Sequence, residues 1–161
     1  MNSGGDFDEP EYPNWLYREL IEGLLPWQHG KKIDFKRFTE KYTLHDSYWI
    51  GIFSNVGCEN TATLAIQWDP VWLPDEIQQS TSNVGDSLYL FILLTKIEQI
   101  SINNYVDIKG HCRSIGTSAV EEIDGKKFLA IDDIYGGQIS IIYQGEETFL
   151  AMDKHKCLLS I

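Results

Sequence analysis

The sequence lacks a long apolar run, an excess of basic residues and a regular spacing of cysteines. Its richest apolar stretch, Leu88 to Leu94, is far shorter than the roughly 18–20 residues that a membrane-spanning helix needs. We therefore expect no membrane partner. Residues 1–13 contain neither the basic nor the apolar segment of a signal peptide, so we expect a cytoplasmic protein.

Basic residues are scarce, because 13 Lys and Arg stand against 24 Asp and Glu and give a net charge of −11. A surface of this sign repels phosphate backbones, so no nucleic acid is expected as a partner. It attracts proteins with a basic surface and accelerates their encounter. The same charge also keeps many cytosolic proteins soluble, and by itself it indicates nothing about the fold.

The three cysteines, Cys58, Cys112 and Cys157, are too few and too far apart for a disulfide framework. We expect reduced thiols that behave as small apolar side chains. His111 beside Cys112, and His155 near Cys157, come closest to a metal-binding pair, but no established zinc or calcium spacing is present. The glycine fingerprints of nucleotide-binding loops are also missing. The sequence predicts neither a metal site nor a cofactor.

What the chain does contain is enough material for a core. Apolar residues make up 43% and aromatic residues 12% of its 161 residues, which suffices for one packed domain. Residues 1–13 combine glycine, acidic residues and two prolines, a composition that predicts a flexible acidic lead-in. Residues 14–161 contain no linker, repeat or low-complexity tract and are expected to form a single domain.

Two short helices are expected after the lead-in. Asn14 is a suitable N-cap for a helix that runs to about residue 25, where Pro26 ends it. A second helical pattern covers residues 34–42, although Phe35 falls outside its apolar face.

The rest of the chain has the alternation and the β-branched and aromatic residues of strands. The apolar run at 88–94 predicts a central strand covered on both faces, and Asp124-Gly125 predicts a tight hairpin turn. The predicted strands cover residues 47–55, 61–69, 88–94, 119–123, 127–132, 138–143 and 148–152. The predicted fold class is α+β, in which two N-terminal helices precede a mostly antiparallel β-sheet built from hairpins.

His45, Asp46 and Ser47 include the residue types of a hydrolase triad. Neighbouring residues on an extended chain point to opposite faces, so adjacency in the sequence does not align them as nucleophile, base and orienting group. We expect His45 and Asp46 to shape the turn between helix and strand, with Asp46 accepting backbone hydrogen bonds.

Acidic residues gather in the lead-in, at Asp6, Asp8, Glu9 and Glu11, and again near the ends of the predicted hairpins. The last four predicted strands are expected to share one sheet, so the later acidic residues are predicted to converge at one edge or end and to pair with Lys and Arg of a basic protein. The alternative is that each pair is a solvated hairpin tip. The candidate partner-binding carboxylates are Glu121, Glu122, Asp124, Asp132, Asp133, Glu146 and Glu147.

Trp72 is added to these candidates because it lies between Pro70 and Pro74 in a predicted loop. Tryptophan is enriched at the hot spots of protein interfaces. Filling of the core is the alternative role for this side chain.

The string Thr43-Leu-His-Asp-Ser-Tyr-Trp-Ile50, followed by a hairpin into Leu64-Ala-Ile-Gln-Trp-Asp69, resembles a pattern of small bacterial immunity proteins. These proteins neutralise polymorphic toxins, including those of contact-dependent growth inhibition systems. The resemblance covers about a third of the chain. It implies a cytosolic, non-enzymatic protein that binds one cognate toxin domain and blocks its active site or substrate surface. It carries over no interface residue, and His45, Asp46 and Ser47 are structural markers there.

Three hypotheses follow. The first is an immunity protein, not an enzyme, that binds and neutralises a cognate toxin with a basic surface, such as a nuclease. The second is a small enzyme with an unrecognised site in which His45 or His111 acts as a general base beside a carboxylate. The third is a general protein-interaction module that self-associates through a sheet edge. The identity of the toxin and the oligomeric state stay open at this point.

Overall fold

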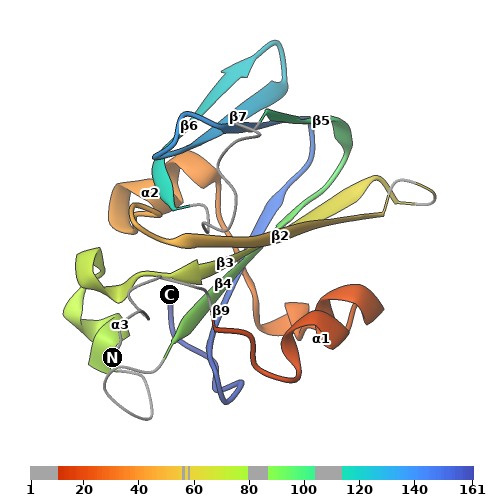
Figure 1. Ribbon diagram of the computed structural model, residues 1–161. Helices are drawn as coiled ribbons and strands as arrows, with labels where there is room; N and C mark the ends of the chain where they lie inside the picture. Colours follow the sequence, from red (N-terminus) through yellow and green to blue (C-terminus); the bar gives the residue numbers. More distant parts are fainter. Residues whose placement is uncertain (1–10, 56, 58, 80–86, 104–113) are drawn as a thin grey trace.

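The computed structural model describes residues 11–55, 57, 59–79, 87–103 and 114–161, and about half of these residues lie in strands. The strands form two antiparallel sheets of five and four strands (Figure 1). The expectation of one sheet was therefore wrong. The fold is mostly β, with a few short helices, the first two of which precede the long strands as predicted.

The five-stranded sheet has the order β1 (Lys31–Lys32), β9 (Glu147–Asp153), β4 (Leu88–Leu94), β3 (Thr61–Trp68) and β2 (Tyr48–Asn55). The four-stranded sheet has the order β5 (Ile97–Asn103), β8 (Gln138–Tyr143), β7 (Lys126–Asp133) and β6 (Ile115–Ile123). Every pairing is antiparallel. Within the described residues, β2 is thus the last strand of one sheet, and β5 and β6 are the edges of the other.

The first helix, α1 (Leu16–Glu22), is shorter than predicted. It starts after Trp15 rather than after Asn14, and it ends at Gly23, whose φ of 69° is the left-handed conformation that closes many helices. Pro26 comes too late to be the stop signal. The N–H of Leu24 bonds to the Glu19 carbonyl at 2.9 Å and completes this cap.

The second helix, α2 (Phe35–Lys41), begins behind Asp34, as predicted. The Asp34 side chain accepts the backbone N–H of Arg37 at 3.0 Å and so satisfies one of the free donors of the first turn. Phe35 was predicted to fall outside the apolar face of this helix, which is wrong: its ring is buried against Phe149. The short elements η2 (Trp27–His29), η3 (Pro70–Trp72) and α3 (Asp75–Gln79) were not predicted.

The central strand β4 is covered on both faces, as its apolar run predicts. Leu90 and Ile92 face a larger core shared with α2 and the four-stranded sheet, whereas Tyr89 and Phe91 face a smaller core that contains α1. In the larger core, the ring of Phe38 stacks on Phe149 with centroids 3.9 Å apart. Such buried aromatic pairs contribute about 0.5–1.5 kcal/mol beyond the burial of their surface.

The chain crosses between the sheets twice at one place. β4 continues into β5 through Thr95 and Lys96, and β8 continues into β9 through residues 144–146. The crossings run together, because Gly145 N–H donates to Thr95 O at 3.1 Å and Thr95 N–H donates to Glu146 O at 3.2 Å. A Cβ on Gly145 would overlap Thr95 Oγ1 and lie 2.5 Å from its carbonyl oxygen. The second crossing places β9 in the five-stranded sheet, so the last four predicted strands do not share a sheet.

The predicted Asp124-Gly125 turn is confirmed. It joins β6 to β7, and its two residues have φ values of 53° and 80°. Positive φ at both central residues is typical of the type I′ turn, whose twist matches that of the flanking strands. This hairpin forms one end of the four-stranded sheet.

The end of the predicted flexible lead-in is attached to the five-stranded sheet. The Glu11 N–H donates to Gln67 Oε1 at 2.6 Å, and the Tyr89 hydroxyl donates to the Glu11 carbonyl at 2.7 Å. Asp6, Asp8 and Glu9 of the same segment lie outside the described residues. In the described ranges, no helix has the length and apolar character needed to cross a membrane.

Candidate functional site

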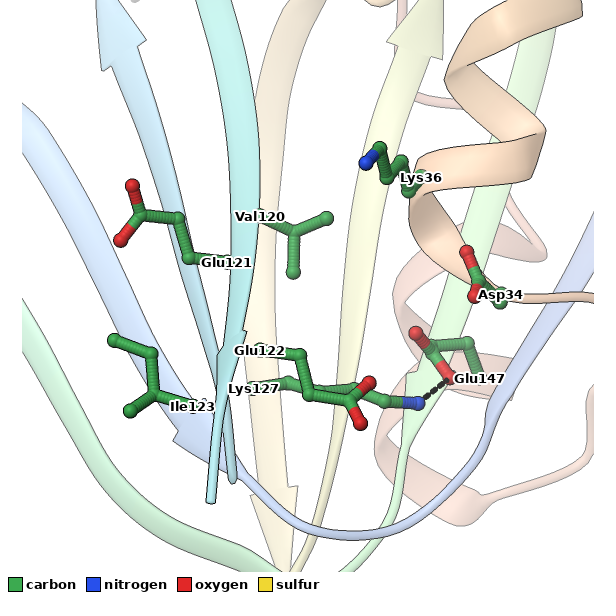
Figure 2. Close-up of a pocket in the computed structure, with 8 residues that line it drawn as sticks. All are labelled: Asp34, Lys36, Val120, Glu121, Glu122, Ile123, Lys127 and Glu147. Atoms are coloured by element: carbon green, nitrogen blue, oxygen red, sulfur yellow. Dashed lines mark hydrogen bonds and ion pairs between the residues drawn. The ribbon is translucent and has the colours of Figure 1, made fainter. Parts of the chain in front are cut away.

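A pocket opens between the start of α2 and the outer strand β6 of the four-stranded sheet (Figure 2). It encloses about 490 Å³. Its walls come from α2, from the β6–β7 hairpin and from the first residue of β9, so both sheets contribute. The lining side chains comprise four carboxylates and two lysines, in addition to Val120 and Ile123; the charged ones are Asp34, Lys36, Glu121, Glu122, Lys127 and Glu147.

Glu147 lines this pocket, and both of its carboxylate oxygens bond to other parts of the protein. Its side chain is 3% exposed, and Lys127 Nζ lies 2.7 Å from its Oε1 (Figure 2). Its other oxygen, Oε2, accepts the Tyr143 hydroxyl at 2.9 Å and the backbone N–H of Phe35 at 3.1 Å. Glu147 thus connects β9 to β7, β8 and α2. It is a structural anchor, because buried carboxylates require such partners.

The Tyr143 hydroxyl is held in its protonated form by this arrangement. Burial of the ring, and then the nearby Glu147 carboxylate, raise the pKa of Tyr143 above its ordinary value. The phenol therefore remains a hydrogen-bond donor to Glu147 throughout the physiological pH range.

The carboxylates at the rim of the pocket are exposed. Glu121 and Glu122 occupy successive positions of β6, opposite Phe128 and Lys127, and their side chains leave opposite faces of the strand (Figure 2). Asp124 follows in the hairpin turn. No hydrogen bond or ion pair joins these three carboxylates to any residue that the structure describes. They remain available to a partner.

Glu146 lies near the same end of the molecule, in the crossing that leads to β9. Its exposed carboxylate is 3.8 Å from the equally exposed ammonium group of Lys32. Surface pairs of this kind contribute little to stability, so Glu146 is free to exchange this contact for another.

Asp132 and Asp133 lie at the opposite end of β7 from the hairpin, and so they are separated from Glu121 and Glu122 by the length of the strand. Asp132 accepts the Gln138 amide at 2.7 Å and the Thr117 hydroxyl at 3.2 Å. Asp133 is buried, and its carboxylate accepts two backbone N–H groups of the turn that follows, those of Tyr135 and Gly137. The predicted convergence of all the acidic clusters does not occur.

Trp72 is 55% exposed on η3 and also lies away from the pocket. Its indole N–H donates to Asp46 Oδ2 at 3.0 Å, and its ring meets the His45 ring edge-on with centroids 5.7 Å apart. His45 Nδ1 lies 3.0 Å from the carbonyl oxygen of Gly116, at the start of β6. These side chains form a second, smaller polar cluster at the far end of the four-stranded sheet.

His45 and Asp46 lie in the turn before β2, as predicted, and Asp46 has a φ of 65°. The Asp46 carboxylate binds the Trp72 side chain rather than the backbone groups that were expected. Ser47 is fully buried, and its hydroxyl oxygen accepts the backbone N–H of Asp69 at 2.9 Å. His45 Nε2 lies 3.5 Å from Asp46 Oδ1, but Ser47 is bonded to Asp69 instead, so the three neighbours do not form a nucleophile–base relay.

Among the remaining candidate ligands, those that the structure describes form no metal-binding cluster. Within the described residues, no three His, Cys, Asp or Glu side chains are grouped to hold a metal ion. Cys157 is exposed and forms no disulfide, and its backbone N–H and that of His155 both donate to the Asp153 carboxylate. Cys58, His111 and Cys112 lie outside the described residues.

Sequence reasoning missed Asp34 and Lys36, which form the α2 wall of the pocket. Asp34 carried a usable signal, since it was recognised as the start of a helix, but nothing in the sequence places that start opposite β6.

No protein-family model, curated protein or solved structure matches the chain at a significant level. The function is therefore argued from the geometry and charge of the chain itself.

Proposed function

We propose that the protein is an immunity protein that binds a cognate toxin domain with a basic surface, such as a nuclease, and blocks it. The observation that carries this proposal is the pair of exposed carboxylates of Glu121 and Glu122, which line an open pocket, with that of Asp124 in the adjoining hairpin turn. The net charge of −11 and the resemblance of the His45 region to immunity proteins support it.

The chemistry of the rim suits a cationic partner. A carboxylate accepts two parallel hydrogen bonds from an arginine guanidinium, and such charge-assisted bonds are among the strongest in protein interfaces. A nuclease holds its substrate with Lys and Arg that contact phosphates. Carboxylates presented at similar positions occupy those cations and exclude the nucleic acid.

Charge inside the pocket favours the same partner. Lys127 is already paired with Glu147, and the lining as a whole carries two more carboxylates than ammonium groups. An arginine or lysine side chain that enters between α2 and β6 meets Glu122 without displacing an existing bond of that residue. Long-range attraction by the whole acidic surface speeds the encounter.

The test is the rate of association with the toxin encoded beside this protein. The variant Glu121→Gln/Glu122→Gln/Asp124→Asn removes three rim charges, and Asn is tolerated at the positive φ of position 124. We expect association at low ionic strength to slow by about tenfold, with the difference shrinking as salt screens the charges. The same variant should protect cells less well from the toxin.

The matched control removes three exposed carboxylates from helices elsewhere, in Glu22→Gln/Glu40→Gln/Glu76→Gln. If both triple variants slow association equally, net charge rather than the rim directs binding. The proposal fails if no toxin is encoded next to this protein, or if the protein does not protect cells from that toxin.

A further inference from the structure

Strand β6, at the edge of the four-stranded sheet, pairs along its length with β7 alone. The pairing runs without a shift from Thr117, opposite Asp132, to Ile123, opposite Lys126. A two-residue turn bonds the pair of residues that flank it, and in an antiparallel ladder every second pair is bonded in the same way. The residues between the bonded ones direct their N–H and C=O groups away from β7. These outward-facing residues are Ser118, Val120 and Glu122.

The outward backbone groups have no partner among the residues that the structure describes. Only the start of the strand is covered, where the Ile115 carbonyl accepts from Asp46 at 2.9 Å and the Ile115 N–H donates to Ser47 at 2.8 Å. From Thr117 to Ile123, the backbone bonds of the described chain go to β7. A row of unpaired N–H and C=O groups is a template for a further strand.

The pocket beside α2 opens along this edge (Figure 2). Four successive residues of β6, 120–123, line the pocket. Side chains of a strand alternate between its faces, so the edge itself borders the open space. Figure 2 shows Val120 and Glu122 directed toward α2, and Glu121 directed to the opposite face. The space of about 490 Å³ leaves room for side chains of an added strand between β6 and α2.

Two carboxylates at this edge have no cation bound to them. Glu122 lies opposite Lys127 in the ladder, but the Lys127 ammonium group is bound to Glu147 at 2.7 Å. Glu121 lies opposite Phe128, which offers no charge. Neither Glu121 nor Glu122 forms a hydrogen bond or ion pair with any residue in the described ranges. A strand added to β6 would therefore meet one unpaired carboxylate on each of its faces.

We propose that an extended segment of the basic partner adds to the edge of β6 as a further strand, with two adjacent basic residues opposite Glu121 and Glu122. The inference rests on the proposed function for the partner and names how that partner is bound. Main-chain hydrogen bonds supply affinity in such strand addition. Opposite charges that face each other across two strands stabilise the pairing. Val120 and Ile123, the latter 52% exposed, favour apolar residues on either side of the basic pair.

The charge of the site selects this occupant over a second copy of the chain. The pocket lining has two more carboxylates than lysines, which are Lys36 and Lys127. A second copy would bring the same carboxylates to the seam and a charge of −11. Like charges opposite each other destabilise paired strands. A cationic segment of about five residues matches the outward-facing stretch 118–122, at roughly 3.3 Å per residue.

The probe is a fluorescent nine-residue peptide with two central arginines, flanked on each side by a valine and then by threonines. Its binding to the full chain is measured by anisotropy. A matched peptide has the same composition, with the arginines moved to its two ends. We expect saturable binding of the first peptide and at least tenfold weaker binding of the second. The amides of Ser118, Val120 and Glu122 should exchange hydrogen rapidly in the protein alone and slowly when the first peptide is bound.

A proline variant tests the backbone edge without changing the charge. Val120→Pro removes one outward N–H, and proline is accepted in edge strands where the N–H faces solvent. We expect it to weaken peptide binding at least tenfold, or about 1.4 kcal/mol. Val120→Ala, which keeps the N–H, is the matched control and should weaken binding less than threefold. Attraction by the carboxylates alone would leave the proline variant equal to the alanine variant and would overturn the inference.

Methylated peptides test the same hydrogen bonds with the wild-type chain. Methyl groups on alternate backbone amides remove donors without changing side chains or charge. Methylation of the set that faces β6 should abolish binding, and methylation of the other set should preserve it. Equal binding of the two methylated peptides, or protection of β5 amides in place of those of β6, would overturn the inference. So would sedimentation that shows a dimer of this chain whose protected amides are those of β6.

The two proposals fail separately. If Val120→Pro leaves dissociation of the toxin unchanged while Glu121→Gln/Glu122→Gln/Asp124→Asn slows its association, strand addition is wrong and the proposed function stands. If the peptide binds at β6 as expected but the protein protects against no toxin, the edge is a peptide site and the immunity function is wrong.

Discussion

Lys127 and Glu147 join the two sheets of this protein. The Lys127 ammonium group, on β7, lies 2.7 Å from Glu147 Oε1, on β9, and their side chains are 19% and 3% exposed. Glu147 also receives the Tyr143 hydroxyl and the Phe35 N–H, so one carboxylate ties both sheets to α2. Removal of one member of such a buried pair leaves an uncompensated charge, which is more costly than the loss of the pair as a whole.

The first prediction concerns this ion pair. Lys127→Met keeps the aliphatic stem but leaves Glu147 buried without a cation, and we expect it to lower the free energy of unfolding by about 2–3 kcal/mol in urea titrations. Adding Glu147→Gln should recover a large part of this loss, since the single amide oxygen of Gln can take the place of Oε2 and accept from both Tyr143 and Phe35. Lys126→Met, which breaks the exposed pair with Glu98, should cost less than about 1 kcal/mol. Equal losses for the two lysine variants would contradict the anchoring role.

The second prediction concerns Tyr143 at alkaline pH. Its raised pKa means that the folded protein keeps the phenol proton above pH 10 or so, whereas the unfolded chain releases it near the ordinary value of about 10. Stability contributed by this group is therefore present at lower pH and is lost as pH rises. The stability of the wild type should fall relative to that of Tyr143→Phe by up to about 1.4 kcal/mol per pH unit.

The measurement is the difference in unfolding free energy between wild type and Tyr143→Phe from pH 8 to 11.5. At pH 8 the variant should be less stable by about 1–2 kcal/mol, because Glu147 loses a donor. The gap should narrow above about pH 10. Tyr17→Phe, which removes an exposed hydroxyl from α1, is the control for general alkaline effects. A gap of constant size would show that the Tyr143 phenol is not protected by the fold.

The third prediction concerns the place where the chain changes sheets. Gly145→Ala puts a methyl group against the side chain and carbonyl of Thr95 and should destabilise the protein by at least about 2 kcal/mol. Gly57→Ala meets no atom within 4 Å and should change stability by less than about 0.5 kcal/mol. The measurement is the midpoint temperature of thermal unfolding of each variant. Similar midpoints would mean that the crossings are not closely packed.

The fourth prediction concerns Trp72. Trp72→Ala removes an exposed ring and one hydrogen bond to Asp46, so the unfolding free energy should change by less than about 1 kcal/mol. Association with the toxin should keep its rate, because the free carboxylates that attract it lie at the other end of the sheet. If Trp72 belongs to the interface, as its exposure predicts, dissociation should quicken by at least about tenfold. Unchanged dissociation would remove Trp72 from the interface.

Local signals predicted much of the secondary structure. The apolar run 88–94 coincides with β4, Asp34 caps α2, and Asp124-Gly125 forms the turn of the β6–β7 hairpin. These features depend on neighbouring residues, through alternation, capping and turn conformation. The same reasoning extended α1 to residue 25, because it overlooked the left-handed cap at Gly23.

The acidic residues show that the local sequence does not predict which carboxylates are exposed. The sequence does not distinguish Glu146 from Glu147, yet Glu146 is exposed and Glu147 is buried and paired with Lys127. Asp133 was predicted to bind a partner, yet its carboxylate accepts the N–H groups of Tyr135 and Gly137 in the turn that follows it. Which carboxylates remain free depends on donors that are distant in sequence or on the detailed turn geometry, and neither follows from the local pattern.

The sequence by itself determined strands β2 to β4 and β6 to β9, the Asp124-Gly125 turn and the acidic charge, because propensity, alternation and turn conformation depend on a few neighbouring residues. Only the tertiary structure decided that β9 belongs to the five-stranded sheet and that Glu121 and Glu122 line an open pocket beside α2. These outcomes depend on contacts such as Gly145 against Thr95 and Lys127 against Glu147, which form between residues brought together by the fold.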